Sequence, residues 1–101
     1  QMIQQIVAGM RVELDAGELL ALRAVVLRAA GKQCTVEASM AKLYCTDNAM
    51  RHATNAIQVL GGRGYLRGSG AERMFRDAKV LQIYDGTNQI QRSIIAKRAL
   101  A

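Results

Sequence analysis

The chain has 101 residues, half of them hydrophobic, and a net charge of +6 at neutral pH. This length suits one domain, and the apolar residues are mostly alanine and aliphatic side chains, because there is no tryptophan and only one phenylalanine. With no proline to interrupt helices, this composition predicts a compact all-α fold. No apolar stretch approaches the ~18 residues that cross a bilayer, and we expect no signal peptide at the N-terminus.

The positive charge is concentrated in the last third of the chain. Residues 1–62 hold six Lys/Arg against five Asp/Glu, a net +1, whereas residues 63–101 hold eight against three, a net +5. Such a region suits an anionic partner, or it is simply a solvated basic face. Cys34, Cys45 and the single histidine, His52, lack the spacing of a zinc site, so we expect no metal and interpret His52 as structural.

A long helix is predicted over the first thirty residues. Apolar residues recur at three- and four-residue steps in its first half, at Ile3, Ile6, Val7, Met10 and Leu14. The stretch 19–30 is apolar nearly all round, which is typical of a helix with several neighbours. Gly31 fits the left-handed position just beyond a helix end.

A second long helix is predicted over residues 36–60, with Thr35 as its N-cap. Large side chains repeat every seven residues at 36, 43, 50 and 57, beside a stripe of small side chains that includes Ala38, Cys45 and Ala53. A seven-residue repeat favours a near-parallel, bundle-like crossing, and a small-residue stripe allows a second helix to approach closely. A shorter helix over 71–80 and a final helix after residue 87 complete the prediction. The expected fold is an antiparallel helical bundle of two long and two shorter helices.

Two segments are candidates for binding or chemistry. Gln58 precedes the turn Gly61-Gly62-Arg63-Gly64, which has more glycines than a helix cap requires, so it is either a cap with a tight loop or a place where a ligand reaches the backbone. Asp85 lies just before the last helix. Either Asp85 or Thr87 caps that helix, or Asp85 is a base that faces a pocket, and the residues alone leave both interpretations open.

Four blocks of sequence carry a family resemblance: EASMAK at 37–42, QVLGGRGY at 58–65, ERMFRDAK at 72–79 and IYDGTNQIQR at 83–92. Their order and spacing resemble the C-terminal all-helical domain of the acyl-CoA dehydrogenase family over nearly the whole chain. The resemblance implies FAD-dependent α,β-dehydrogenation of acyl-CoA thioesters, in which a carboxylate removes the α-proton while the β-hydrogen leaves as hydride to the flavin.

The resemblance also assigns roles to individual residues. Asp85 corresponds to the glutamate base of a Tyr-Glu-Gly-Thr motif, and Tyr84 and Gly86 line the thioester end of the substrate pocket. The implied FAD contacts are Thr87 and Gln89, with Gln58, Gly61 and Gly62 meeting the adenine-diphosphate part of a neighbouring subunit's FAD. Aspartate is one methylene shorter than glutamate, which shifts the carboxylate unless the backbone compensates.

The family's N-terminal helical domain and middle β domain are absent from these 101 residues. We therefore expect residues 1–101 to be a C-terminal domain or truncated relative, inactive alone and unable to enclose FAD alone. Expected partners are further copies, as a dimer or tetramer, together with acyl-CoA and an electron-transfer flavoprotein, in a bacterial cytoplasm or a mitochondrial matrix. The alternative is a stand-alone, non-catalytic helical module that self-associates. We do not expect membrane binding, and nucleic-acid binding is disfavoured because the basic region lacks interleaved aromatic residues.

Overall fold

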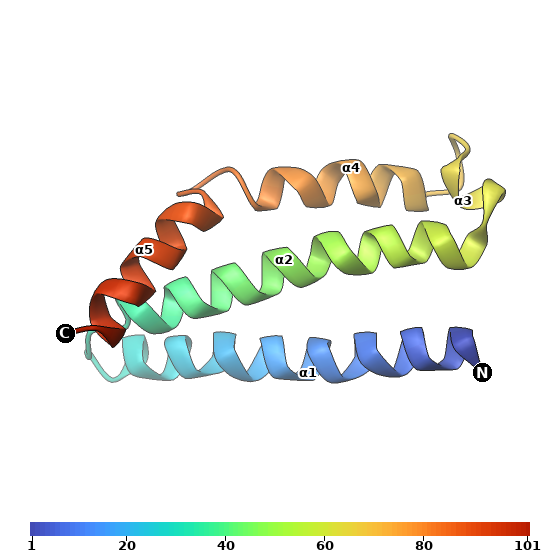
Figure 1. The fold of residues 1–101 in the computed structure, drawn as a ribbon. Helices are drawn as coiled ribbons and strands as arrows, with labels where there is room; N and C mark the ends of the chain where they lie inside the picture. Colours follow the sequence, from blue (N-terminus) through green and yellow to red (C-terminus); the bar gives the residue numbers. More distant parts are fainter.

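The computed structural model describes all 101 residues and contains five helices and no strands. The helices are α1 (Met2–Ala29), α2 (Thr35–Leu60), α3 (Gly62–Tyr65), α4 (Ala71–Leu81) and α5 (Asn88–Ala99). Helix α2 lies in the middle, with α1 antiparallel along one side and α4 and α5 in succession along the other (Figure 1). The predicted all-α, antiparallel arrangement is confirmed. The helices form an open bundle, because α1 contacts α2 alone.

Helices α1 and α2 pack closely where both present small side chains. Gly17 is buried, and a Cβ built on it would come within 3.0 Å of the Cys45 sulfur. Cys45 in turn donates a weak hydrogen bond to the Gly17 carbonyl oxygen, at 3.6 Å. Gly31 has a φ of +69° at the end of α1, as the sequence predicts. This glycine therefore lets the chain reverse into α2.

The start of α2 and the glycine turn both differ from the sequence-based prediction. Cys34 is the N-cap of α2 and Thr35 its first helical residue, because the Cys34 carbonyl accepts the first helical hydrogen bond, from the Ala38 amide at 2.8 Å. The side chain of Cys34 forms no cap hydrogen bond. The predicted loop after α2 contains one further helical turn, α3. Gly64 fits there because a Cβ on it would lie 2.9 Å from the Ile57 carbonyl oxygen.

The chain buries little apolar surface. Its accessible area is 7560 Å², whereas a compact monomer of 11.0 kDa exposes about 5,600 Å². Its radius of gyration is 15.8 Å, against about 13 Å for a compact domain of this length. The buried apolar residues are all alanines, while many large side chains of α1 are exposed, including Val12, Leu19 and Val25. Such a surface is typical of a domain that packs against further protein.

Candidate functional site

Asp85 lies at the tip of the turn between α4 and α5 and is exposed. Its φ of +52° makes it the one non-glycine residue in the left-handed region, and Gly86 follows with a φ of +86°. Aspartate tolerates this conformation better than most residues do. The cap of α5 is Thr87, whose hydroxyl accepts a hydrogen bond from the Ile90 amide at 3.4 Å. Of the two candidate caps, Thr87 is therefore correct, and the Asp85 carboxylate takes no part in a hydrogen bond or ion pair.

The C-terminal side of this turn is anchored to α2 by a lysine. The Lys42 ammonium donates to the Gly86 carbonyl oxygen at 2.7 Å and to the Asn88 side-chain oxygen at 3.0 Å. Gln91, one turn into α5, donates from its buried amide to the same Gly86 carbonyl at 3.1 Å. The turn that presents Asp85 is thus held by two side chains through its backbone.

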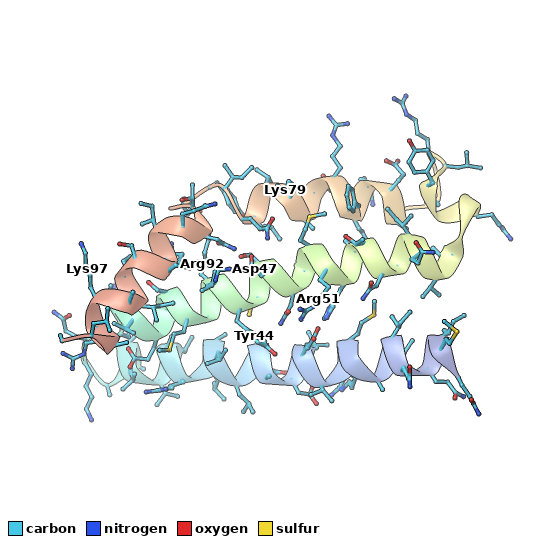
Figure 2. All side chains as sticks on the ribbon, in the orientation of Figure 1. Tyr44, Asp47, Arg51, Lys79, Arg92 and Lys97 are labelled. Carbon is cyan, nitrogen blue, oxygen red and sulfur yellow. The ribbon has the colours of Figure 1, made fainter.

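A second anchor, Asp47 on α2, ties down both ends of the turn. One Asp47 oxygen accepts from Gln82 and from Asn88, each at 2.7 Å, and the other accepts from Arg92 at 2.7 Å. Figure 2 shows Asp47 and Arg92 facing each other between α2 and α5. The amide of Asn88 also donates to the Thr46 hydroxyl at 2.8 Å. Residues before and after Asp85 are consequently fixed to one face of α2.

Asp85 borders a groove of about 670 Å³ between the α1–α2 loop and α5. Three cationic side chains contribute to its lining, Arg28, Lys32 and Lys42. None of the three forms an ion pair with a carboxylate. The groove therefore offers uncompensated positive charge beside a single carboxylate, which suits an anionic ligand.

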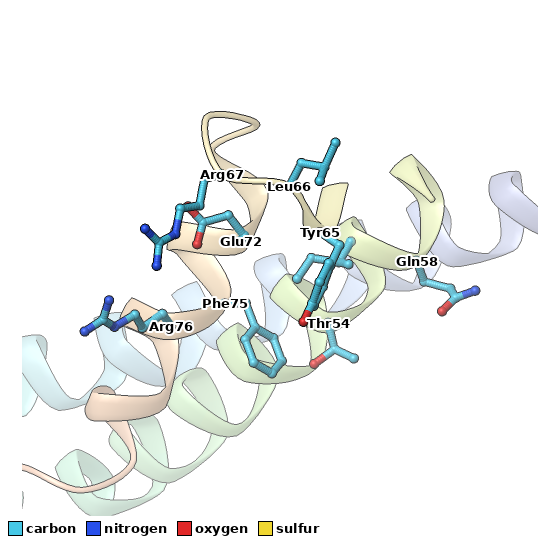
Figure 3. A pocket seen from close by; sticks show the side chains of 9 residues that line it. Thr54, Gln58, Tyr65, Leu66, Arg67, Glu72, Phe75 and Arg76 are labelled. Carbon is cyan, nitrogen blue, oxygen red and sulfur yellow. The ribbon is translucent and has the colours of Figure 1, made fainter. Parts of the chain in front are cut away.

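The glycine turn is exposed at the opposite end of α2. Gly61 has a φ of +62°, and a Cβ on either Gly61 or Gly62 would meet no atom within 4 Å. A ligand can therefore approach this backbone directly. Gln58 is exposed one turn earlier and borders a hollow of about 610 Å³ that also includes Tyr65 and Phe75 (Figure 3). The glycine turn thus has the open backbone that close contact with a phosphate group requires.

The predicted site residues fall into two groups that one molecule does not bring together. Tyr84, Asp85, Gly86, Thr87 and Gln89 share the α4–α5 turn and the start of α5, beside Lys42. Gln58, Gly61 and Gly62 lie at the C-terminal end of α2. Lys42 and Gly61 are nineteen positions apart along that helix, or about 28 Å. Both groups reach the surface.

Sequence reasoning missed the residues that hold the turn. In the sequence, the only signal for these residues is that three polar positions of α2 lie beside the two predicted stripes: Lys42, Thr46 and Asp47. Asn88 follows the cap residue Thr87 and reads from sequence as an ordinary first-turn residue. Its burial, with only 6% of its surface exposed, arises from contacts with residues more than forty positions away.

A separate polar cluster joins α1 to α2. Glu13 pairs with His52 and, at 2.6 Å, with Arg51. Hydrogen bonds from His52 and then from Arg51 lower the pKa of the Glu13 carboxyl below its ordinary value. Burial raises the pKa of the Cys45 thiol, which keeps it protonated. His52 therefore takes part in the polar contact between α1 and α2. No group of three His, Cys, Asp or Glu side chains is arranged to hold a metal ion.

Comparison with known proteins gives a consistent result across sequence and structure. Residues 1–100 match the family model of the acyl-CoA dehydrogenase C-terminal domain. The chain is 51% identical over 100 residues to cyclohexane-1-carbonyl-CoA dehydrogenase of Geobacter metallireducens, covering 99% of this chain and 26% of that protein. It is 42% identical over 100 residues to the mitochondrial short-chain specific acyl-CoA dehydrogenase of Bos taurus, covering 99% and 24%.

Solved structures superpose over the same extent. Butyryl-CoA dehydrogenase from Megasphaera elsdenii matches with a TM-score of 0.97 at 38% identity, covering 100% of this chain and 26% of that one. An FAD complex of PigA matches with a TM-score of 0.93 at 27% identity, covering 98% and 26%. The chain spans about a quarter of the length of these relatives. Separately, no helix in the structure combines the length and the apolar character of a membrane span. The chain therefore belongs to the acyl-CoA dehydrogenase family of flavoproteins and forms its all-helical C-terminal domain.

Proposed function

We propose that this domain serves an FAD-dependent dehydrogenase that oxidises acyl-CoA thioesters between Cα and Cβ. Its own contributions are a base, parts of the FAD and substrate sites, and the surface for oligomer assembly. The observation that carries the proposal is the state of Asp85: an unpaired carboxylate on a turn that is anchored on both sides and bordered by a cationic groove. A carboxylate that neither caps a helix nor forms an ion pair is free to accept a proton.

Asp85 is the base in this proposal, and it removes the α-proton of the bound thioester. A substrate lying over the turn displaces water from the carboxylate, and desolvation makes a carboxylate a stronger base. FAD, when bound, supplies the acceptor for the hydride that leaves Cβ. Tyr84 is half exposed and precedes the base directly, and Gly86, which has no side chain of its own, follows it. These two residues border the thioester.

The residues assigned to FAD fit a dinucleotide in two separate places. Gly61 and Gly62 present open backbone, and Gln58 adds an exposed amide for the adenine-diphosphate portion. Thr87 and Gln89 lie beside Asp85, where a flavin must lie to receive hydride from the substrate. Because the two places are separated along α2, we assign them to two different FAD molecules at the junction of two subunits.

The thin core supports assembly into a homo-oligomer. The large excess of accessible surface and the apolar residues exposed along α1 require cover from another copy or from the remaining three quarters of the protein. We propose the bacterial cytoplasm or the mitochondrial matrix as the compartment and an electron-transfer flavoprotein as the final electron acceptor, on the strength of the family.

Anaerobic titration of the full-length protein with butyryl-CoA and cyclohexane-1-carbonyl-CoA tests the proposal. We expect at least one thioester to bleach the visible flavin absorbance, and the 101-residue chain mixed with FAD to show no bleaching. Absence of flavin reduction by any acyl-CoA contradicts the proposed function. Flavin reduction by the 101-residue chain contradicts the claim that the other domains are needed.

A second candidate is a non-catalytic module that self-associates, and the exposed apolar side of α1 favours it. The two candidates differ in the Asp85 turn, since a module with a purely structural role has no use for an unpaired carboxylate there. Under this second candidate, the full-length protein with FAD leaves every acyl-CoA unchanged while the chain still oligomerises.

A further inference from the structure

The turn that presents Asp85 is held from α2, and the holding contacts avoid the carboxylate. The loop between Gln82 and Asn88 is closed by a backbone hydrogen bond, in which the backbone N–H of Asn88 donates to the Gln82 carbonyl oxygen at 3.0 Å. Above that closure the Gly86 carbonyl receives two side-chain donors, Lys42 at 2.7 Å and Gln91 at 3.1 Å, while the Gln91 amide makes a longer bond of 3.5 Å to the Asp85 carbonyl. The position of Asp85 therefore depends on where Gly86 is held.

The backbone of the turn needs such support. Asp85 and Gly86 are consecutive residues with positive φ, a conformation that L-residues other than glycine adopt reluctantly. The space over Gly86 is filled by the Gln91 amide nitrogen, which lies 2.9 Å from the place a Cβ would occupy. Lys42 completes the enclosure from α2, since its nitrogen bridges Gly86 and Asn88.

The short side chain of aspartate makes the backbone position more important than it is for glutamate. With one methylene fewer, the carboxylate of Asp85 has less freedom to correct for a displaced Cα. A misplacement of about 1 Å between reacting groups costs on the order of 100-fold in rate. Contacts that fix the Gly86 carbonyl consequently fix the distance between the carboxylate and the α-carbon of a bound thioester.

From this geometry we infer that Lys42 is a positioning residue for Asp85, acting through the Gly86 carbonyl and the Asn88 side chain. The inference rests on the proposed function, because it assumes that Asp85 is the base. The main effect of Lys42 is therefore expected on the rate and not on substrate affinity, since both hydrogen bonds of its ammonium go to the turn itself. Thr46 supports the same arrangement, because its hydroxyl accepts from the Asn88 amide and donates to the Lys42 carbonyl, each at 2.8 Å.

Rapid-reaction measurements of flavin reduction in the full-length holoenzyme test the inference. We expect Lys42→Met to lower the rate constant for flavin reduction about 100-fold while the acyl-CoA KM stays within about threefold. Thr46→Val is the gentler variant, because it keeps the shape and removes one support, and we expect a fall of about fivefold with KM unchanged. The matched control is Lys97→Met, at an exposed lysine in the last turn of α5, which should behave as the wild type (Figure 2).

A second readout separates positioning from a general structural role. If the carboxylate is displaced, removal of the α-proton becomes more rate-limiting, so the isotope effect of an α-deuterated substrate should increase in both α2 variants. Lys42→Arg should recover only part of the rate, because a planar guanidinium does not reproduce the bridging ammonium. If Lys42→Met fails to fold, the rate and isotope effect of Thr46→Val decide the question.

Three results overturn the inference. They are a flavin-reduction rate within twofold of the wild type in both Lys42→Met and Thr46→Val, an increase in KM with an unchanged rate, or an unchanged isotope effect. In each case the wild type still oxidises acyl-CoA and the proposed function stands. A wild-type holoenzyme that no acyl-CoA reduces contradicts the proposed function itself, which makes the two failures distinguishable.

Discussion

The side-chain amide of Asn88 donates to a carboxylate oxygen of Asp47 at 2.7 Å, across 41 positions of sequence. Asp47 also accepts from Gln82 and Arg92, so a single carboxylate on α2 fixes the end of α4 and the start of α5. No direct packing joins α4 to α5. Each helix packs against α2 instead, and the Asp47 contacts add a polar link that fixes the turn between them.

Replacing Asp47 with alanine should destabilise the chain markedly. The change leaves the largely buried Asn88 amide without one acceptor and removes hydrogen bonds to a charged group, which are worth about 1.5–3 kcal/mol each. We expect a loss of about 3 kcal/mol in the free energy of unfolding, measured by urea denaturation. Asp77→Ala is the control, because Asp77 is exposed and forms no ion pair, and it should change stability by less than about 0.5 kcal/mol. Equal effects of the two substitutions contradict the anchoring role of Asp47.

Replacing Gly86 with alanine should disturb the Asp85 turn. Its φ of +86° disfavours any side chain, and the new Cβ would come within 2.9 Å of the Gln91 amide. We expect a loss of about 1–2 kcal/mol in the free energy of unfolding, together with a change in the NMR shifts of Asp85. Gly62→Ala adds the same methyl group where nothing lies within 4 Å, and it should be close to neutral for stability. A neutral Gly86→Ala would show that the turn adopts another conformation in solution.

The contacts of Glu13 predict how the free energy of unfolding falls at acidic pH. His52 and Arg51 lower the pKa of the folded Glu13 carboxyl below the ordinary value of 4.5. The folded state therefore binds this proton less readily than the unfolded state does. The stabilisation is fully present above pH 4.5 and is lost as the pH falls through the lower, folded-state pKa.

Glu13→Gln should therefore flatten the dependence of unfolding free energy on pH below 4.5 and reduce stability at neutral pH. Chemical denaturation at a series of pH values measures both effects. Asp15→Asn is the control, because Asp15 forms only an exposed pair with Arg11 within α1. Superimposable pH curves for wild type and Glu13→Gln are the result that the Glu13 contacts do not allow.

Introducing charge on α1 should weaken association between copies. Leu19 is 66% exposed on this helix, which contacts only α2 within the chain. We expect Leu19→Glu to shift the chain toward monomer in light scattering after size exclusion, because a charge in an apolar interface is costly to desolvate. Gln5→Glu adds the same charge at an exposed polar position and should leave the oligomer intact. If Leu19→Glu does not alter the molar mass, this part of α1 is not an interface between copies.

Sequence periodicity predicted the helices well because it reports on local geometry. The second long helix and the end of the first at Gly31 are predicted from residues only a few positions apart. The structure contains both the helix and the left-handed glycine that follows α1. The extra turn α3 differs from the prediction because three glycines indicate a loop, whereas here the chain turns back onto the end of α2 and brings Gly64 against Ile57. The prediction of Thr35 as the N-cap of α2 is wrong by one residue. A threonine side chain suits an N-cap, but Thr35 is already helical and Cys34 holds the N-cap position.

The candidate site was only partly predictable from sequence. The glycine turn and the aspartate are visible as unusual residue types, and the choice between Thr87 and Asp85 as cap required the backbone. The anchors Lys42 and Asp47 show only as polar positions beside the stripes of α2, since their partners lie 35 or more positions away. Polar contacts between distant segments are determined by the fold, and a single sequence does not display them.

The exchange of the α-proton is the most direct test of Asp85 as the base. Full-length wild type and Asp85→Asn would be incubated in deuterated water with a 3-thia acyl-CoA, whose sulfur at the β-position prevents hydride transfer but leaves the α-protons acidic. We predict deuterium incorporation at Cα by the wild type and a loss of at least about 1,000-fold in Asp85→Asn, because the amide does not accept the proton. Exchange at the wild-type rate in Asp85→Asn, with the substrate still bound, would contradict the central claim.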